Sequence, residues 1–226
     1  MSDDDAQRSA RWATWYRFAT PAIDRTIALV ALVALSPLLL LIALLTRLDS
    51  DGPALFRQRR VGHRQQTFTM LKFRSMRVDV SDERHRSYVT TLLAAGEDEV
   101  VASAGTDGTY KLENDDRITR VGRFLRATGL DELPQLVNIV RGEMALVGPR
   151  PALDYEVELY REGDHARFAV LPGITGLWQA TARNQVDMRT MLDLDLEYVA
   201  RRNPLLDLRI IVWTLRALVA NPRGAR

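Results

Sequence analysis

The sequence predicts a mostly helical α+β protein, in which a membrane helix near the start precedes a small polar domain with short strands. Two observations support this fold class. The run Ile27 to Leu45 holds nineteen residues without a charge, which as a helix matches the hydrocarbon thickness of a bilayer. Beyond it, apolar residues recur at helical spacing and are interrupted by short apolar stretches typical of buried strands.

Composition excludes several classes of protein. The chain has 226 residues, of which 46% are hydrophobic and 27% charged, so most of it is not disordered. It has no cysteine, which excludes a disulfide framework, thiolate metal sites and a cysteine nucleophile. Its three histidines lack metal-ligand spacing, so a zinc site is not expected. The net charge of +2 hides a basic patch over residues 57–77, which holds seven Lys or Arg residues and no acidic one.

The apolar run contains Ser36 and Pro37 near its middle. Pro37 has no N–H, so the carbonyl of Val33 loses its helical partner, and we expect a kink with the Ser36 hydroxyl bonding back into that turn. Basic residues, which mark the cytoplasmic side of a membrane segment, lie on both sides of the run. The residues therefore leave two interpretations open: one spanning helix, or a re-entrant helix with both ends in the cytoplasm.

Two further segments are candidates for the membrane interface. Aromatic residues Trp12, Trp15, Tyr16 and Phe18 alternate with arginines before the apolar run, as in an interfacial anchor. Residues Leu205 to Val219 are apolar over a broad face and form either an amphipathic helix on the membrane or part of the core.

The rest of the chain shows local signals for short elements. Residues 81–114 are polar and glycine-containing, which indicates an insertion. The other expected elements are a helix from near Leu133 that ends at Gly142, a strand over Ala145–Val147, a helix over Asp154–Arg167, a turn over Pro172–Gly176 and a helix over Met188–Arg201.

The first candidate for chemistry is the adjacent pair Asp131 and Glu132. Pro134 suits the first turn of a helix, which places both carboxylates at or just before a helix N-terminus. Because adjacent carboxylates do not easily aim at one point, two distinct roles fit them: one nucleophile, and one metal or acid–base partner. N-terminal capping by Asp131 is the simpler interpretation of this segment alone.

The second candidate is Arg150, between Pro149 and Pro151. The prolines stiffen the backbone, so Arg150 becomes a preorganised planar fork suited to a phosphate, or the arginine of a rigid loop that pairs with a carboxylate. The third is the basic patch that ends in Lys72 and Arg74. Few aromatic residues interrupt it, so nucleic acid is not expected, and anionic lipid or a diphosphate is the favoured partner.

Weaker signals lie near the C-terminus. One is the pair Arg183 and Asn184. The other is the acidic trio Asp193, Asp195 and Glu197, and we interpret this trio as a solvated helix face.

The candidate residues predict more in combination than each does alone. A diphosphate site needs several cations and Mg²⁺, which prefers carboxylate and phosphate oxygens. A membrane segment beside that site points to a lipid as the second substrate. The residues thus predict phosphoryl-group chemistry at a membrane surface.

Four segments resemble the bacterial sugar transferases, which are monotopic polyprenyl-phosphate phosphoglycosyl transferases. These segments are KFRSM at 72–76, DDRITRVGRFLRATGLDELPQLVNIVRGEMALVGPRP at 115–151, PGITGLWQ at 172–179 and LDLEYV at 194–199. The resemblance covers Ile23 to Leu218. It implies transfer of a phosphosugar from a UDP-sugar to undecaprenyl phosphate with release of UMP, as the first membrane step of exopolysaccharide, O-antigen or glycoconjugate assembly.

The resemblance also implies roles for individual residues. It assigns catalysis and Mg²⁺ binding to Asp131 and Glu132, with Asp131 as the nucleophile, and a helix break to Ser36 and Pro37. The remaining expected contacts are phosphate binding by Lys72, Arg74, Arg126 and Arg150, and sugar or nucleotide binding by Arg183 and Asn184.

The expected organisation follows from the same resemblance. It comprises an interfacial segment at 1–22, a re-entrant membrane helix at 23–48 and a cytosolic catalytic domain at 49–226, with the insertion at about 81–114. The protein is expected at the bacterial inner membrane, with its catalytic domain facing the cytoplasm. Expected partners are the UDP-sugar, undecaprenyl phosphate and an anionic phospholipid membrane, without nucleic acid, and a homodimer is also considered.

Two other functions are weighed against this one. A membrane-bound glycosyl transferase would move the sugar without its phosphate and would release UDP. A non-catalytic scaffold would bind anionic lipid through residues 57–77, but it would leave Asp131, Glu132 and Arg150 without a role.

Overall fold

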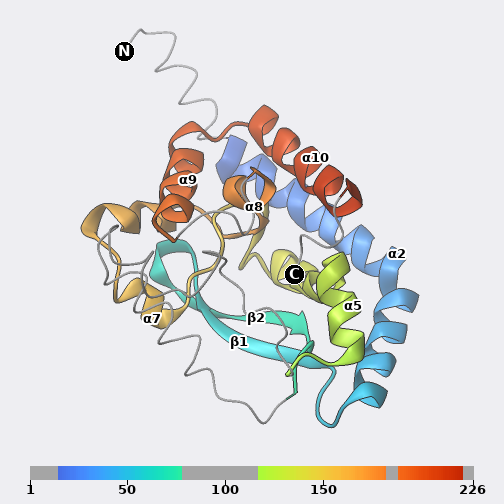
Figure 1. The fold of residues 1–226 in the computed structure, drawn as a ribbon. Helices are drawn as coiled ribbons and strands as arrows, with labels where there is room; N and C mark the ends of the chain where they lie inside the picture. Colours follow the sequence, from blue (N-terminus) through green and yellow to red (C-terminus); the bar gives the residue numbers. More distant parts are fainter. Residues whose placement is uncertain (1–14, 78–116, 182–187, 221–226) are drawn as a thin grey trace, which may run out of the picture.

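A long bent helix flanks a body of short helices and two small sheets (Figure 1). The computed structural model describes residues 15–77, 117–181 and 188–220. The expected insertion, most of the interfacial segment, and Arg183 and Asn184 lie outside these residues. The predicted fold class, mostly helical α+β with one long apolar helix near the N-terminus, is confirmed.

The described elements follow one another as η1 (Trp15–Ala19), α2 (Thr20–Asp49), β1 (Leu55–Val61), η2 (His63–Gln65), β2 (Thr67–Phe73), α5 (Arg120–Thr128), η3 (Leu130–Glu132), α6 (Gln135–Arg141), β3 (Ala145–Val147), α7 (Asp154–Val157), η4 (Glu162–Ala169), β4 (Gly173–Thr175), α8 (Leu177–Thr181), α9 (Met188–Arg201) and α10 (Pro204–Ala220).

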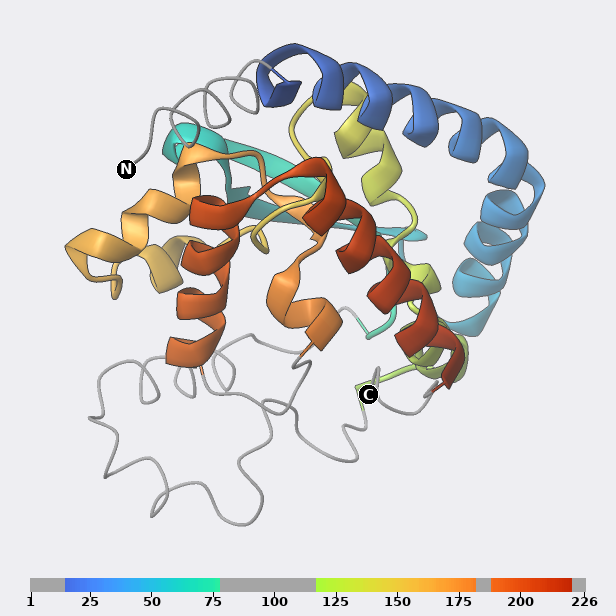
Figure 2. The ribbon, with the colours of Figure 1, turned by 90° about the horizontal axis from the view of Figure 1, so that it is seen from above.

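Helix α2 continues through its internal proline and bends. Pro37 lies inside the 30-residue helix, and the Ser36 hydroxyl donates to the Val33 carbonyl over 2.8 Å, as the sequence predicts. Figure 2 shows the helix turning in its middle, so that its two halves run along different sides of the body. The hydroxyl supplies a partner for a carbonyl that proline leaves without one, which matters where no water can do so.

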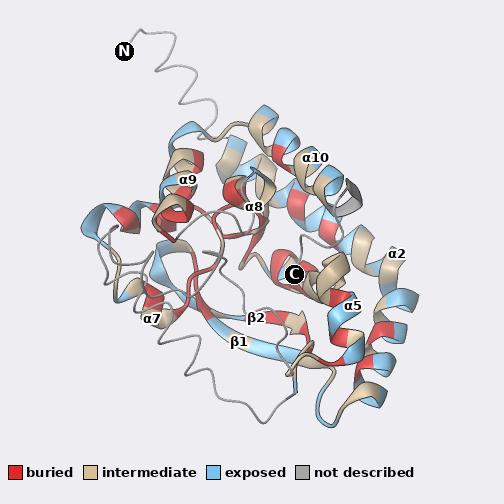
Figure 3. Ribbon diagram, in the orientation of Figure 1, coloured by how far each residue is buried: buried red, intermediate tan, exposed pale blue. Residues whose placement is uncertain are grey.

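Both halves of α2 pack on the same body. In the first half, Ala28 is fully buried against Met70 of β2 and Ile139 of α6. In the second half, Ile42 packs with Phe73 and Leu125. Between these contacts the helix exposes a broad apolar surface, visible as the pale positions along α2 in Figure 3.

Hydrogen bonds fasten each end of α2 to that body. The Asp24 carboxylate accepts from the Leu146 backbone N–H over 3.1 Å, and the Asp49 carboxylate accepts from the Val121 N–H over 2.8 Å. These bonds join the helix to β3 at one end and to the start of α5 at the other.

The described residues form two small sheets of two strands each. Strands β1 and β2 make an antiparallel hairpin in which Leu55 pairs with Phe73, and β3 and β4 pair in parallel with Val147 opposite Thr175. The second sheet corrects one prediction. The segment expected as a turn at Pro172–Gly176 contains strand β4, because Gly173 pairs with Ala145, which lies 28 residues earlier in the chain.

The helices confirm most sequence-based boundaries and correct one. Gly142 ends α6 in the left-handed region at φ 77°, and α9 spans Met188–Arg201 as expected. The single helix expected over Asp154–Arg167 is instead α7 followed by the 3-10 helix η4. A second helix begins at η4 because the Asp164 carboxylate accepts a hydrogen bond from the Arg161 N–H over 2.8 Å, which caps the N-terminus of η4.

The terminal elements η1 and α10 also expose apolar residues. On α10, Leu205, Leu208, Val212 and Leu215 are exposed, and on η1 Phe18 is 64% exposed. Tyr16 differs from the expected anchor, because its hydroxyl donates to the Asp207 carboxylate of α10 over 2.6 Å. The exposed apolar residues of η1, α2 and α10 give this protein a surface suited to a membrane.

Candidate active site

Asp131 and Glu132 lie in the single turn η3 between α5 and α6. Gly129 ends α5 at φ 71°, and its N–H bonds the carbonyl of Leu125. Glycine adopts this conformation at little cost, so the chain turns directly before the acidic pair. Helix α6 starts at Gln135, which confirms that the pair precedes a helix.

Glu132 is held by two side chains from different elements. The Lys72 Nζ atom of β2 lies 2.8 Å from Oε1, and the Gln135 amide of α6 donates to Oε2 over 3.1 Å. Burial acts to raise the pKa of Glu132, but the charge and hydrogen bond of Lys72, with the charge of Arg150, outweigh it and hold the pKa below its usual value. Glu132 is therefore ionised at neutral pH.

Asp131 has a different environment. Burial raises its pKa to about 6, the charge of Glu132 adds to the rise, and the charges of Lys72 and Arg126 oppose it. A carboxylate that is ionised at neutral pH but weakly stabilised retains its basicity, which suits a nucleophile better than the tightly paired Glu132. The site thus gives the two neighbouring carboxylates separate chemical characters.

Lys72 reaches this pair because Asn138 aligns β2 with α6. The Asn138 side chain accepts from the Leu71 N–H over 3.1 Å and donates to the Thr69 carbonyl over 2.7 Å. It is fully buried, and it occupies the free edge of β2 as a neighbouring strand would. This fixes the register of β2 against α6, which brings Lys72 to Glu132.

Arg126 and Arg150 approach the pair from two other elements. Arg126 lies in the last turn of α5, whose start is capped by the Thr119 hydroxyl accepting from the Gly122 N–H. Arg150 follows β3, and its charge acts on Glu132. Gly148 and Gly173 let the backbones of β3 and β4 approach closely, since a Cβ on either would clash with backbone atoms of the other strand.

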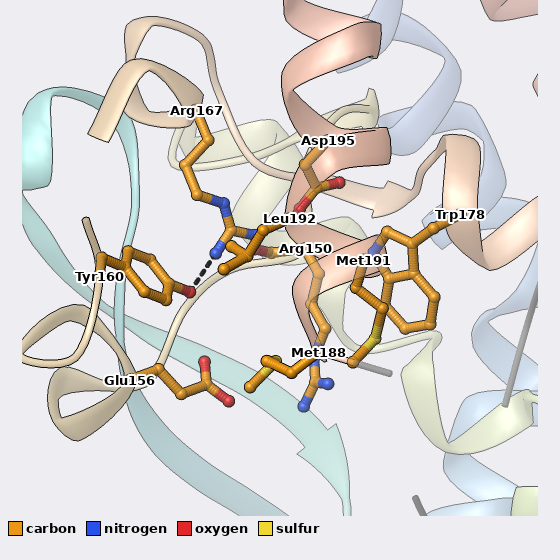
Figure 4. A pocket seen from close by; sticks show the side chains of 9 residues that line it. All are labelled: Arg150, Glu156, Tyr160, Arg167, Trp178, Met188, Met191, Leu192 and Asp195. Atoms are coloured by element: carbon orange, nitrogen blue, oxygen red, sulfur yellow. Dashed lines mark hydrogen bonds and ion pairs between the residues drawn. The ribbon is translucent and has the colours of Figure 1, made fainter. Parts of the chain in front are cut away.

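Arg150 also lines a small cavity (Figure 4). Its charged lining consists of Arg150, Glu156, Arg167 and Asp195, and the aromatic rings of Tyr160 and Trp178 complete it with three further apolar side chains. The cavity of about 20 Å³ has room for a water molecule. Figure 4 shows the side chain of Arg150 running away from the guanidinium of Arg167, so the two cations are turned apart.

Comparison with known proteins identifies the family. The family model described as "Bacterial sugar transferase" matches residues 15–221. The chain belongs to the bacterial sugar transferase family. It is therefore an enzyme that transfers a sugar-containing group, and the site described above is its candidate active site.

Several curated proteins are similar to this sugar transferase. The exopolysaccharide production protein ExoY of Sinorhizobium fredii is 42% identical over 197 residues, which cover 87% of this chain and 84% of that protein. The undecaprenyl-phosphate galactose phosphotransferase of Salmonella typhimurium is 37% identical, over 90% of this chain and 41% of its own length. The UDP-glucose:undecaprenyl-phosphate glucose-1-phosphate transferase of Xanthomonas campestris is 41% identical, over 84% of this chain and 37% of its own length.

Within the described residues of the transferase, no group of three or more metal-binding side chains occurs. Asp131 and Glu132 nevertheless suit Mg²⁺, because this ion is commonly held by one or two carboxylates and completes its coordination with water and substrate phosphates. Lys72 and Gln135 each bond one Glu132 oxygen, and because each carboxylate oxygen has two lone pairs, Glu132 as well as Asp131 can still bind the ion.

Arg74 is not directed at the acidic pair. It is buried, and its guanidinium donates to the carbonyls of Thr46, Ser50 and Asp51 at the C-terminus of α2. The last carbonyls of a helix lack intrahelical partners, so Arg74 satisfies groups that would otherwise be orphaned. These contacts support a structural role and argue against the expected direct contact with phosphate.

We expect Arg74→Lys to lower stability rather than to impair catalysis selectively. A lysine keeps the charge but loses the fork that reaches several carbonyls, which costs about 1–2 kcal/mol of unfolding free energy. Thermal denaturation in detergent, together with the specific activity of the folded fraction, measures both effects. Near-normal stability combined with a large loss of activity would restore the phosphate-binding assignment.

The sequence does not predict the contacts of three residues in or near this site. Gln135 and Asn138 lie on the helix after Asp131 and Glu132. Only the fold shows that Gln135 binds Glu132 and that Asn138 binds the backbone of β2. Asp195, predicted to lie on a solvated face, is instead 1% exposed and paired with Arg167. Its neighbour Asp193 is exposed, as predicted.

Proposed function

We propose that this sugar transferase moves a phosphosugar from a UDP-sugar to undecaprenyl phosphate and releases UMP, as a membrane step of exopolysaccharide assembly. One observation carries the proposal: Asp131 lies beside a Glu132–Lys72 ion pair, with Arg126 and Arg150 close enough for their charges to act on the two carboxylates. The nucleophile is therefore surrounded by cations, and transfer of a phosphosugar needs such cations to offset the charge of the phosphate groups. The names of the similar proteins, which include UDP-glucose and undecaprenyl phosphate, support the choice of substrates.

In the proposed mechanism Asp131 first attacks the phosphorus that carries the sugar. A bond forms between the Asp131 carboxylate oxygen and that phosphorus, the bond to the bridging diphosphate oxygen breaks, and UMP leaves. An oxygen of undecaprenyl phosphate then attacks the same phosphorus and expels the Asp131 carboxylate, giving the polyprenyl-diphosphate sugar. The two steps replace one direct reaction between two bulky anions.

The other residues bind and orient. Arg126 and Arg150 contact the phosphate oxygens and offset their charge, and Lys72 keeps Glu132 ionised and in place beside Asp131. Mg²⁺, held by Asp131 and Glu132 when bound, supplies further neutralisation of the diphosphate. Arg183 and Asn184 keep their proposed contact with the sugar or nucleotide.

The membrane arrangement that fits this reaction is re-entrant, with the catalytic domain in the cytoplasm. Asp24 and Asp49 lie near opposite ends of α2, yet each accepts a hydrogen bond from the same body. A spanning helix would separate these ends by the thickness of the bilayer, whereas a bent helix that enters and leaves one leaflet keeps both contacts. The exposed apolar residues between the ends would lie in the lipid.

Cysteine labelling tests the re-entrant arrangement. Because the natural chain has no cysteine, single cysteines at Ala10 and Asp51 can be labelled specifically on either side of α2. We expect both to react with a membrane-impermeant maleimide only after inverted vesicles expose the cytoplasmic face. Labelling of the two positions from opposite faces would mean that α2 spans the membrane. In the companion variant Pro37→Ala, straightening of the helix should shift part of the population toward that spanning state.

A panel of UDP-sugars tests the reaction itself. Purified enzyme in detergent should release UMP from one or a few of them in the presence of Mg²⁺ and undecaprenyl phosphate. Release of UDP would identify a glycosyl transferase that leaves the phosphate behind. Binding of lipid without release of either nucleotide, across the whole panel, would favour the scaffold.

A further inference from the structure

The segment Pro149–Pro151 is held at three successive carbonyls. In chain order they accept from the Gly173 N–H at 2.9 Å, the Arg167 guanidinium at 2.6 Å and the Arg60 guanidinium at 3.0 Å. The two prolines have no N–H, so the carbonyls are the principal groups through which hydrogen bonds can hold this backbone in place. Three different elements, β4, η4 and β1, thereby fix the position of the Arg150 backbone.

Arg167 is itself held by a buried ion pair. Its guanidinium lies 2.6 Å from the Asp195 carboxylate, with side chains only 6% and 2% exposed, and it also donates to the Tyr160 hydroxyl. The rings of Tyr160 and Phe168 lie 5.4 and 5.8 Å from the guanidinium carbon. Burial acts to lower the pKa of Arg167, but the charges of Asp195, Tyr160 and Glu156 together outweigh it, so the pKa is raised and the charge persists.

Stability alone is a poor explanation for this arrangement. Removing two charges from water costs several kcal/mol per ion, and well-packed apolar side chains often replace such a pair without loss of stability. The surroundings are also incompletely paired, because Asp195 Oδ1, Arg167 Nε and Glu156 Oε1 are buried without a hydrogen-bond partner. All three residues line the cavity beside Arg150, which has room for water but not for a sugar.

We propose that Arg167 and Asp195 form a positioning unit for Arg150. Asp195 holds the Arg167 guanidinium, Arg167 holds the Arg150 carbonyl, and the side chain of Arg150 is thereby presented toward the acidic pair and the donor phosphate. Neither Arg167 nor Asp195 contacts the substrate. The inference rests on the phosphate-binding role of Arg150 in the proposed function.

A double-mutant cycle tests this chain of contacts. Arg167→Gln is made in the natural sequence and in an Arg150→Ala background, and kcat/KM is measured as transfer of radiolabelled sugar from UDP-sugar to lipid. This readout responds whether UMP or UDP leaves, so failure of the proposed reaction is distinguishable from failure of this inference. Radiolabel counting also follows losses of several orders of magnitude.

We expect Arg167→Gln to lower kcat/KM by about 10- to 100-fold in the natural sequence, as a displacement of about 1 Å in a binding group does. In the Arg150→Ala background the further loss should be less than about threefold, because the group that Arg167 positions is already absent. Equal losses in both backgrounds, or a loss below about threefold in the natural sequence, would overturn the inference.

The ion pair between Arg189 and Asp164 provides a matched control. It also joins α9 to η4, at 2.8 Å, but through Asp164 and not through the Arg150 carbonyl that Arg167 holds. Arg189→Gln should reduce kcat/KM by less than about threefold; a loss equal to that of Arg167→Gln would show that any bond between these helices has the same effect. If Arg167→Gln does not yield folded protein, Asp195→Asn enters the same cycle, with a smaller loss expected and the same dependence on Arg150.

Discussion

Asp131→Asn should reduce turnover by several orders of magnitude while leaving binding of the UDP-sugar largely intact. The amide keeps the shape of the carboxylate but has no negative oxygen to attack phosphorus, so both chemical steps are lost. Glu132, Lys72 and Gln135 keep their mutual contacts, because none of the hydrogen bonds of Glu132 involves Asp131. Steady-state assay of nucleotide release, with calorimetric titration of the UDP-sugar, separates the two effects.

The decisive measurement is intact-protein mass spectrometry after the enzyme meets Mg²⁺ and UDP-sugar without a lipid acceptor. The natural enzyme should gain the mass of one phosphosugar, and Asp131→Asn should gain none. Asp193→Asn is the matched control, since Asp193 is an exposed aspartate on α9, and it should form the adduct normally. If nucleotide is released only when lipid is present and no adduct can be trapped, transfer occurs in one step and Asp131 is a metal ligand.

The parts of the fold that the sequence predicts correctly are those with local causes. Ser36 and Val33 are three residues apart, so the bond between them at the Pro37 bend follows from helix geometry alone. Gly142 ends α6 because only a few residue types tolerate the left-handed conformation there. The position of Asp131 and Glu132 before a helix follows likewise from Pro134 and the apolar spacing behind it.

The parts that it misses depend on partners far away in the chain. Asp195 alternates with leucines and other acidic residues, a pattern typical of a solvated face, and only Arg167, 28 residues earlier, explains its burial. Arg74 lies in a basic patch, but its partners are carbonyls at the end of α2, which lie 24 to 28 residues earlier in the chain. In both cases the fold, rather than the local pattern, decides what a charge contacts.

Arg150→Lys provides the second large effect, because it separates charge from shape. The backbone at position 150 is held by its carbonyl, so a lysine there cannot approach the phosphate by moving the loop. It keeps one positive charge but loses the planar fork, and we expect a loss of about 1.5–3 kcal/mol of charge-assisted hydrogen bonding. That corresponds to about 10- to 150-fold in kcat/KM for the UDP-sugar.

The control for Arg150→Lys is Arg59→Lys, at an exposed arginine whose ion pair with Asp154 lies on the surface. Exposed pairs contribute little, so this variant should retain full activity. Thermal denaturation should give similar midpoints for both variants, because neither substitution changes a backbone contact. If Arg150→Lys is as active as Arg59→Lys, the site requires only a positive charge at position 150; if it is inactive and also unstable, Arg150 supports the loop rather than the phosphate.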